Sequence, residues 1–468
     1  MDFDFFKGKK ITVFGLGLHG GGVGIVKFLV NRGAKVIVTD IKTRDQLAPS
    51  IAKIKDLKNV ELVLGQHRRE DFEKVDMVIK TPPVPWTNEH VQLALKNNIP
   101  VEMDSSLFFK LCKNTIIGVT GTKGKTTTAS LIFEILKTAG KKVIKAGVGQ
   151  ASVLDKLENL EKDTVVVFEL SSWRLSALGR AKLSPHIAVI KNILPDHLNY
   201  YKSMEEYLAD KENIFLYQGP KDFLIINGDD EMLRTSAEKA KSQVIKFSQS
   251  FIKESKSVYT EDDSIFINDG VDIKKLVATS DIKLPGKHNI SNIMAAAGAA
   301  FALGLPLKMI AEGIRQFKGV PHRLEFVREL DGVRYYNDTA ATIPDAMLGA
   351  LDSFSEPIIL IAGGTDKKLY FTLAGKEILS KTKDVIFLKG DATNKLINEL
   401  QKNLDAEEKN RDFVIVDSME QAVQEARRIA RAGDIVLLSP GAASFGLFLN
   451  EFDRGEKFRE AVRNLTSA

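Results

Sequence analysis

Cysteine is nearly absent from the sequence, because 468 residues include only Cys112. A single cysteine excludes an internal disulfide framework and is typical of a protein in a reducing cytoplasm. No apolar run reaches the roughly 18 residues that a transmembrane helix needs. The first ten residues, MDFDFFKGKK, also lack the apolar core of a signal peptide. We therefore expect a cytoplasmic protein without a membrane partner.

A strong excess of one charge is missing as well. The chain has 66 lysines and arginines against 61 aspartates and glutamates, which gives a net charge of +5. A nucleic-acid-stimulated ATPase would need a clustered basic face, or aromatic side chains on which single strands stack. The charges are scattered along the chain and there are only 2 Trp. The composition therefore indicates no nucleic-acid partner.

The length and composition are those of a globular protein with several domains. At roughly 150 residues per domain, 468 residues predict three. Buried-strand patterns alternate with helical patterns, which predicts an α/β fold with mainly parallel sheets. We place the domains at residues 1–105, 106–319 and 320–468. The first and third are expected to be Rossmann-like, and the second is expected to be a P-loop mononucleotide-binding sheet.

The stretch TIIGVTGTKGKTTTAS, residues 115–130, is the clearest functional motif. An apolar strand runs into a glycine-rich turn, and an apolar-periodic helix follows. The backbone N–H groups of such a turn and the positive end of the helix dipole both attract phosphate. Lys125 can add positive charge at the β- and γ-phosphates, and the Thr126 hydroxyl can hold Mg²⁺. The stretch predicts a nucleoside triphosphate site.

A second glycine-rich turn lies near the N-terminus, where Gly15, Gly17 and Gly20 separate a strand from a helix. The next strand ends in Asp40, about 20 residues further on, which completes a dinucleotide-binding fingerprint. Glycines let the backbone approach any diphosphate, so the motif leaves the ligand open. A nicotinamide-dependent oxidoreductase would explain this domain but would leave the phosphate loop without a role.

Three more polar residues of the second domain follow predicted strands. Glu169 ends the strand at 164–170, where a carboxylate is well placed to reach Mg²⁺ directly or through water. His197 follows the strand at 186–194, and Lys211 lies on the next helix. From the residues alone, each has an ordinary alternative: a solvated strand end, a satisfied histidine and a solvated helix face.

The third domain shows strands at 335–338, 357–364, 384–390, 412–418 and 434–444, with helices between them. The loops after these strands carry Asp338, Lys367 and Ser444. The carboxyl ends of parallel strands meet at one edge of a sheet, so Lys367 and Ser444 are expected to lie together. Lys367, next to Lys368, is also compatible with a solvated loop lysine.

Several segments resemble one family and occur in its order. They are T-G-T-K-G-K-T-T at 120–127, E-L-S-S-W-R-L at 169–175, N-I-L-P-D-H-L at 192–198, A-D-K at 209–211 and G-V-P-H-R-L-E at 319–325. On these segments the whole chain resembles the Mur ligase family, which includes the folylpolyglutamate synthases. The segment at 169–175 is most similar to the branch that adds D-glutamate, which disfavours a sibling ligase or a folylpolyglutamate synthase.

The resemblance implies an ATP-dependent carboxylate–amine ligase of peptidoglycan precursor synthesis. The γ-phosphate of ATP would move to the carboxylate of UDP-N-acetylmuramoyl-L-alanine, and the amine of D-glutamate would attack the acyl phosphate. Lys125, Glu169, His197 and Lys211 would be catalytic. Two Mg²⁺ ions would be held by Thr126, Glu169, His197 and Lys211, the last carbamylated by CO₂. We expect a monomer whose domains close around the substrates.

The resemblance also implies three groups of binding residues. Those for ATP are Gly121, Thr122, Lys123, Gly124, Lys125, Thr126, Thr127, Asn292, Arg323 and Asp338. Those for the UDP precursor are Gly15, Gly17, Leu18, His19, Asp40, Ile41, Lys42, Thr81, Pro82 and Ser171, with Lys80 beside them. Those for D-glutamate are Thr342, Lys367, Ser444 and Phe452.

The sequence departs from the family pattern in a few places. Ala340 stands where the family usually has a lysine, and Val148 or Gly149 stands where an asparagine commonly touches the precursor. Gly21 and Gly22 extend the N-terminal glycine turn. The C-terminal aromatic is Phe452, one position beyond its usual place at residue 451.

Overall fold

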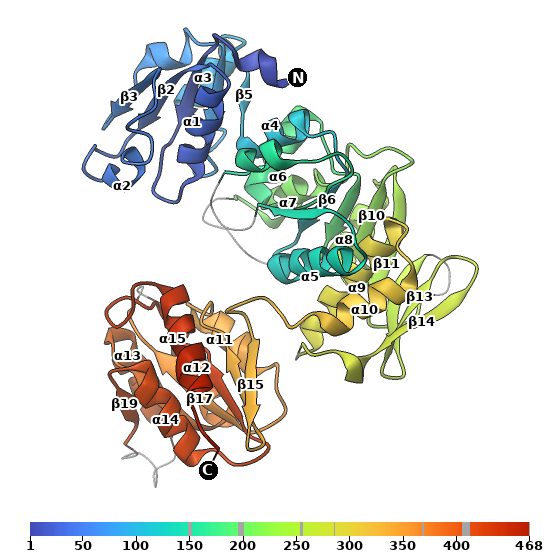
Figure 1. Cartoon of the computed structure of the whole chain (residues 1–468), viewed down its shortest axis with the longest axis vertical. Helices are drawn as coiled ribbons and strands as arrows, with labels where there is room; N and C mark the ends of the chain where they lie inside the picture. The colour runs from blue at the N-terminus through green and yellow to red at the C-terminus, as the bar shows by residue number, and fades with distance from the viewer. Residues whose placement is uncertain are drawn as a thin grey trace. The chain divides into compact units, whose positions relative to one another are not determined.

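The computed structural model describes residues 1–147, 152–194, 201–252, 256–284, 286–366, 369–404 and 412–467, except the side chains of residues 159 and 287. The chain divides into two compact units (Figure 1). Unit 1 comprises Met1–Thr279 and Ser291–Arg315. Unit 2 comprises Ser280–Ile290 and Gln316–Ala468.

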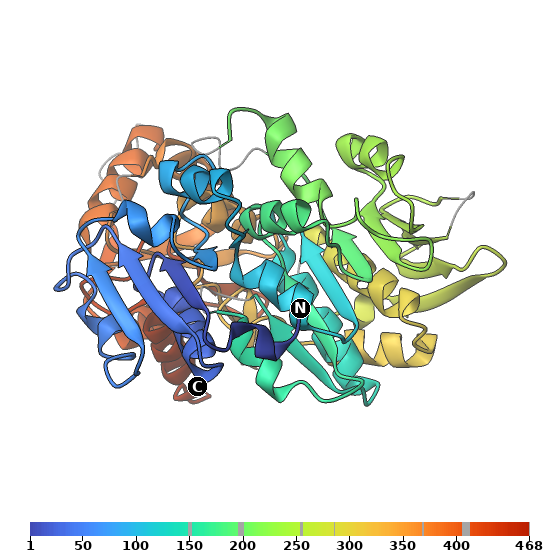
Figure 2. The same ribbon diagram turned by 90° about the horizontal axis from the view of Figure 1, so that it is seen from above.

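The first sheet of unit 1, drawn in blue in Figure 2, is parallel and has the strand order β3-β2-β1-β4-β5. Its strands are β1 Lys10–Phe14, β2 Lys35–Asp40, β3 Val60–Leu64, β4 Met77–Lys80 and β5 Val101–Glu102. The helices in this part of the chain are η1 Phe3–Phe6, α1 Gly21–Asn31, α2 Ala48–Ile51, η2 Arg69–Phe72, α3 Glu89–Lys96 and α4 Asp104–Leu111. The strand order reverses at β1, so the glycine turn after β1 lies at the switch point where such sheets bind ligands.

The second sheet of unit 1 has the order β14-β13-β12-β11-β10-β9-β6-β8-β7. It is parallel from β7 to β12 and ends in an antiparallel meander formed by β12, β13 and β14. Its strands are β6 Ile116–Thr120, β7 Val143–Ala146, β8 Val165–Glu169, β9 Ile187–Ile190, β10 Phe223–Asn227, β11 Gln243–Ser248, β12 Ser257–Glu261, β13 Ser264–Asn268 and β14 Ile273–Ala278. Central strands such as β6 and β9 are wholly buried, because helices cover both faces.

The helices of this stretch connect the strands or follow them. They are α5 Lys125–Thr138, η3 Leu154–Asn159, α6 Ser172–Ala181, α7 Met204–Glu212, α8 Glu231–Ala237, η4 Thr279–Asp281, α9 Lys287–Ala302 and α10 Leu307–Gln316. One continuous apolar cluster contains Phe28 of α1, Leu154 of η3 and Phe168 of β8. The two sheets of unit 1 therefore share a core.

Unit 2 contains one sheet with the order β15-β16-β20-β17-β18-β19. Its strands are β15 Glu325–Leu330, β16 Val333–Asn337, β17 Ile358–Gly363, β18 Thr382–Leu388, β19 Val414–Val416 and β20 Ile435–Leu438. Its helices are α11 Pro344–Leu351, α12 Thr372–Lys381, α13 Asp391–Asn403, α14 Met419–Ile429 and α15 Glu451–Arg463. β15 pairs antiparallel with β16, and the remaining pairs are parallel.

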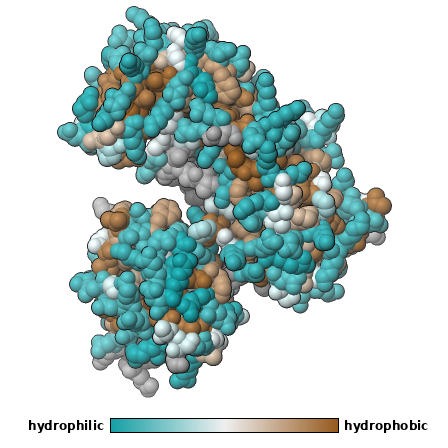
Figure 3. Space-filling model, viewed as in Figure 1, coloured by the Kyte–Doolittle hydropathy of each residue, from teal (hydrophilic) through white to brown (hydrophobic). Residues whose placement is uncertain are grey.

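Among the described residues, no helix is both long and apolar enough to span a membrane. On the face drawn in Figure 3, polar side chains predominate and apolar ones gather in small patches.

Candidate active site

The phosphate loop has the predicted form, a strand, a glycine-rich turn and a helix start. β6 ends at Thr120, and α5 begins at Lys125 after Gly124, whose φ is 81°. The Lys125 ammonium Nζ donates to the carbonyl oxygens of Gly121 and Thr122, both at 2.9 Å. The residues predicted to bind phosphates, 121–127, thus lie on this turn and on the first turn of α5.

Two asparagines support the loop from neighbouring elements. Asn192, after β9, accepts from the backbone N–H groups of Thr122 at 3.0 Å and Lys123 at 2.9 Å through Oδ1. Asn292 of α9 accepts from the Thr128 hydroxyl at 3.3 Å. A Cβ on Gly124 would come within 2.4 Å of Asn292 Oδ1. The predicted ATP residue Asn292 therefore lies against the phosphate loop.

Two buried lysines lie beneath the loop. Lys211, on α7, is 1% exposed, and its Nζ donates to the carbonyl of Gly121 at 3.0 Å. Lys191, just after β9, is equally buried and donates to the Ser291 hydroxyl at 2.9 Å. Burial lowers the pKa of Lys191 well below its usual value. The sequence predicted a role for Lys211 and none for Lys191.

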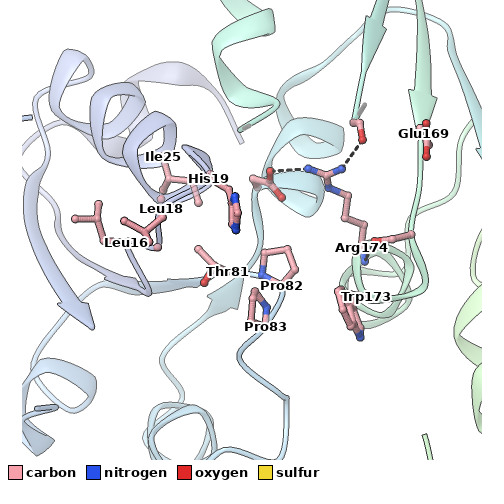
Figure 4. A pocket seen from close by; sticks show the side chains of 16 residues that line it. Leu16, Leu18, His19, Ile25, Thr81, Pro82, Pro83, Glu169, Trp173 and Arg174 are labelled. Atoms are coloured by element: carbon pink, nitrogen blue, oxygen red, sulfur yellow. Dashed lines mark hydrogen bonds and ion pairs between the residues drawn. The ribbon is translucent and has the colours of Figure 1, made fainter. Parts of the chain in front are cut away.

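Glu169 connects the phosphate loop to a neighbouring cavity. In the sheet, Glu169 at the end of β8 pairs with Val119, next to the first residues of the loop. Its carboxylate atom Oε2 is buried and has no hydrogen-bond partner in the described part of the chain. The side chain lines a cavity of about 340 Å³ (Figure 4). A carboxylate with an unsatisfied oxygen at this edge fits a cation ligand.

The cavity lies between the N-terminal glycine turn and the second sheet of unit 1. Its walls are formed by Leu16, Gly17, Leu18, His19, Gly21, Gly22, Ile25, Thr81, Pro82, Pro83, Asp104, Gly147, Glu169, Ser171, Trp173 and Arg174. It thus brings together six predicted precursor residues, Gly17, Leu18, His19, Thr81, Pro82 and Ser171. Four others, Gly15, Asp40, Ile41 and Lys42, are not on its walls.

Asp40 shapes the glycine turn. Its carboxylate oxygen Oδ2 accepts from the backbone N–H groups of Leu16 at 2.9 Å and Gly17 at 3.0 Å. Its other oxygen, Oδ1, accepts from the N–H of Lys42 at 3.0 Å. The acidic position of the fingerprint therefore fixes the turn, and a contact between Asp40 and a ligand stays a prediction.

One of the two added glycines, Gly22, has a steric reason. A Cβ on Gly22 would lie 2.4 Å from the carbonyl oxygen of Leu16, so α1 can approach the end of β1 only without a side chain there. A contact between Lys80 and the precursor stays a prediction, because the Lys80 side chain is not on the cavity wall. Its Nζ donates to the carbonyl of Val84 at 2.9 Å and lies 4.4 Å from the Trp86 ring centroid. Burial lowers the pKa of Lys80 to about 7.

Asp104 and Arg174 belong to the cavity wall, although neither was among the predicted site residues. Arg174 lies in the E-L-S-S-W-R-L segment, but its partner is 70 residues away in the chain. Sequence spacing shows no such pairing. An acid at the start of the helix at 104–111 and an arginine on the buried side of the helix at 172–181 were the available signals.

In unit 2, the predicted residues Asp338 and Thr342 follow β16, and Ser444 follows the adjacent strand β20. Asp338 follows β16 and is 7% exposed. It accepts from the Leu324 N–H at 3.1 Å and from the Ser439 hydroxyl at 2.9 Å. Burial raises the pKa of Asp338 to about 7. Asp338 therefore organises its own loops, and its contact with ATP stays a prediction.

The candidate amino-acid residues lie on neighbouring loops of the same sheet edge. The N–H of Gly441 donates to the carbonyl of Ala341 at 2.9 Å, which places the segment carrying Ser444 beside that carrying Thr342. Ser444 is 3% exposed, whereas Arg323 is exposed. Phe452 is 58% exposed, with its ring 5.6 Å from that of His322.

A fully buried arginine, which no sequence motif indicated, holds these loops. Arg454 of α15 donates through Nε to the Thr339 hydroxyl at 2.9 Å and through one terminal nitrogen to the Ala442 carbonyl at 3.2 Å. Burial lowers the pKa of Arg454 to about 10, so the group remains a cation at neutral pH. Predicted positions 148, 149, 197 and 367 lie outside the described residues.

The fold and the loop define a class of protein. A glycine-rich loop between a buried parallel strand and a helix is the phosphate-binding device of nucleotide-dependent α/β enzymes. Two solved structures, both from Thermotoga maritima, share the fold. The chain matches UDP-N-acetylmuramate-alanine ligase with TM-score 0.56 and 19% identity, covering 97% of this chain and 99% of that one. The chain also matches MurF ligase in complex with ADP, with TM-score 0.56 and 16% identity, covering 98% of this chain and 99% of that one.

Sequence comparison identifies the family. The Mur ligase MurD-like N-terminal domain matches residues 9–102, the Mur ligase middle domain residues 119–300, and the Mur ligase glutamate ligase domain residues 322–441. UDP-N-acetylmuramoylalanine–D-glutamate ligase of Roseiflexus sp. (strain RS-1) is 42% identical, over 98% of this chain and 99% of its own length. The ligase of the same name from Clostridioides difficile (strain 630) is 39% identical, over 98% of this chain and 99% of its own length. The chain belongs to the Mur ligase family and is an ATP-dependent, amide-bond-forming ligase. The predicted α/β fold and family are confirmed.

Proposed function

We propose that this ligase joins D-glutamate to UDP-N-acetylmuramoyl-L-alanine through an acyl phosphate. Full-length relatives at 34–42% identity that carry this activity in their names support the choice of substrates. The observation that carries the chemistry is the position of Glu169. It is paired with the strand that leads into the phosphate loop, and it also lines the cavity beside the N-terminal glycine turn. The cavity therefore extends from a nucleotide-type turn to the strand end that lies beside the strand leading into the phosphate loop.

In the proposed reaction, the phosphate loop binds the phosphates of ATP, with Lys125 neutralising charge on the β- and γ-phosphates. A carboxylate oxygen of the precursor attacks the γ-phosphorus, and ADP leaves. The amine of D-glutamate then attacks the acyl carbon, phosphate leaves with both electrons of its C–O bond, and the nitrogen loses a proton. The enzyme must exclude water, since water would hydrolyse the acyl phosphate.

Magnesium would supply charge neutralisation at the transferring phosphoryl group. In the described residues there is no group of three His, Cys, Asp or Glu side chains that could hold a metal ion by itself. The unpartnered oxygen of Glu169 and the Thr126 hydroxyl on the first turn of α5 fit one ion that is shared with ATP phosphates. A second ion, with His197 and Lys211, stays part of the proposal.

Carbamylation of Lys211 belongs to the same proposal. The neutral amine would attack CO₂, forming an N–C bond and releasing one proton, which replaces an ammonium by an anionic oxygen donor. Its burial and its position under Gly121 support this reaction, because burial favours a neutral amine. The amino acid is proposed to bind unit 2 at Thr342, Lys367, Ser444 and Phe452, and Arg323 and Asp338 are proposed to serve ATP. We infer that the ligation takes place in the cytoplasm, where ATP is available.

The test is substrate dependence of phosphate release. Sustained release should require ATP, UDP-N-acetylmuramoyl-L-alanine and D-glutamate together, because the acyl phosphate needs both an acceptor carboxylate and an amine. Equal turnover with L-glutamate, or with ATP alone, would contradict the proposed function.

A further inference from the structure

The wall of the cavity carries a buried pair of opposite charges. Asp104 is the first residue of α4 and is 4% exposed, and Arg174 of α6 is 6% exposed. One terminal nitrogen of the guanidinium donates to Asp104 Oδ2 at 3.4 Å, and the other donates to the carbonyl of Gly147 at 2.9 Å (Figure 4). Both residues line the cavity.

Each member of the pair has one unused polar atom. Within the described part of the chain, Asp104 Oδ1 and Arg174 Nε are buried and have no hydrogen-bond partner. An unsatisfied buried donor or acceptor costs free energy, and native structures contain few of them. Two such atoms on adjacent side chains of a cavity wall are therefore expected to find partners on a ligand.

The two atoms differ in kind, which restricts the ligand. Asp104 Oδ1 is an acceptor and requires an N–H or O–H group, whereas Arg174 Nε–H is a donor and requires an oxygen. A carboxylate or phosphate oxygen would satisfy Arg174 and would be repelled by Asp104. A secondary amide has one N–H and one C=O, and it carries no charge. It matches the pair in both respects.

We propose that Asp104 and Arg174 form a binding site for a secondary amide of the precursor. The inference rests on the proposed function, in which UDP-N-acetylmuramoyl-L-alanine occupies this cavity. That precursor has two secondary amides, the N-acetyl group of the sugar and the bond between the lactoyl group and L-alanine. Both have the required chemistry. The pair thus selects substrates by an uncharged group that takes no part in the reaction.

The experiment compares three substrates with the wild-type enzyme. They are the natural precursor, an analogue that lacks the N-acetyl group, and an analogue in which an ester oxygen replaces the lactoyl–alanine N–H. Loss of one hydrogen bond to a charged group should raise the Michaelis constant of one analogue about 10- to 100-fold. The analogue affected identifies the amide. Equal Michaelis constants for all three substrates would overturn the inference.

Substitutions then assign the discrimination to the pair. Asp104→Asn replaces the acceptor at one oxygen by an N–H₂ donor, so the Michaelis constant of the natural precursor should rise about tenfold or more. The constants for ATP and D-glutamate should change less than about twofold. The variant should no longer discriminate against the affected analogue. Equal weakening of all three precursors would instead indicate a structural role and contradict the proposal.

A matched control is available two residues before Asp104, at the end of β5. Glu102 precedes α4, is 7% exposed and pairs with Lys110, but it does not line the cavity. Glu102→Gln should leave the preference among the precursors unchanged. If the Asp104→Asn variant does not fold, the Arg174→Gln variant and the comparison of the three precursors with the wild-type enzyme still test the proposed amide site. Absence of wild-type turnover with the natural precursor would refute the proposed function, whereas turnover without amide discrimination would refute only this inference.

Discussion

Buried charged side chains hold the loops of both candidate sites. Lys211 donates to the phosphate loop of unit 1, and Arg454 joins two loops of unit 2. Such groups are costly to bury, and they persist because several hydrogen bonds satisfy them. Removing one partner should therefore have larger effects than removing an exposed ion pair, which contributes about 0 to 1 kcal/mol.

Lys211→Met tests the proposed role of the buried lysine. The substitution keeps the apolar stem and removes both the amine and any carbamate formed on it. We expect turnover to fall about 100-fold or more, as losses at metal sites commonly do, while the protein stays folded. Steady-state kinetics with and without added acetate would measure the loss and a partial rescue.

Lys239→Met is the matched control. Lys239 is half-exposed and pairs with Glu212, the residue next to Lys211. Its replacement should leave turnover nearly unchanged. If Lys211→Met retained most of the activity, the proposed carbamate would be wrong.

Asp338→Asn tests a pH dependence in unit 2. Burial raises the pKa of Asp338 from 3.8 to about 7. The folded state therefore binds this proton more tightly than the unfolded state does. The resulting stabilisation is complete below pH 3.8 and is lost as the pH rises towards about 7. The asparagine variant, which does not titrate, should show a smaller decrease in unfolding temperature between pH 4 and pH 7.

Thermal unfolding at a series of pH values would measure this slope. Asp352→Asn provides the comparison, because Asp352 is exposed and pairs with Lys381 on the surface of the same unit. That variant should keep the wild-type slope. Identical slopes for Asp338→Asn and the wild type would contradict the burial argument.

At the scale of elements, the sequence predicted what depends on local pattern. Buried parallel strands such as β8 and the turn at 121–124 followed from apolar runs and glycine spacing. The antiparallel edge strand β15 was missed, because its burial is uneven and its alternation weak. Contacts between Asp104 and Arg174, or between Thr339 and Arg454, depend on packing of distant segments. Periodicity and motif spacing carry no information on such contacts.

The role of glycine in the phosphate loop can be tested by a pair of substitutions at the two ends of α5. Gly124 and Gly140 both have positive φ, at 81° and 71°. A Cβ at residue 124 would collide with Asn292, whereas a Cβ at residue 140 meets nothing within 4 Å. Each alanine should lower stability by about 1 kcal/mol or more. Only Gly124→Ala should also raise the Michaelis constant of ATP, by about tenfold or more.

Calorimetric ADP binding and thermal unfolding of both variants would separate the two effects. Equal nucleotide binding by the Gly124→Ala and Gly140→Ala variants would show that the loop tolerates a side chain at Gly124.

At the scale of the whole molecule, the comparisons establish a Mur ligase, and the structure shows how its parts are built. Unit 1 combines a glycine turn, a cavity and a phosphate loop around one shared core. Unit 2 has a separate parallel sheet with its own candidate binding edge. The domain boundaries at 105/106 and 319/320, and the assigned roles of individual residues, stay predictions.

The central claim is that the γ-phosphoryl group is transferred to the precursor carboxylate before D-glutamate is added. An acyl phosphate leaves one carboxylate oxygen on the released phosphate. We therefore predict that UDP-N-acetylmuramoyl-L-alanine labelled with ¹⁸O in its alanine carboxylate yields phosphate with one ¹⁸O atom per D-glutamate incorporated. Mass spectrometry of the phosphate and of the product measures both quantities in the same reaction. Product formation with unlabelled phosphate would contradict the account.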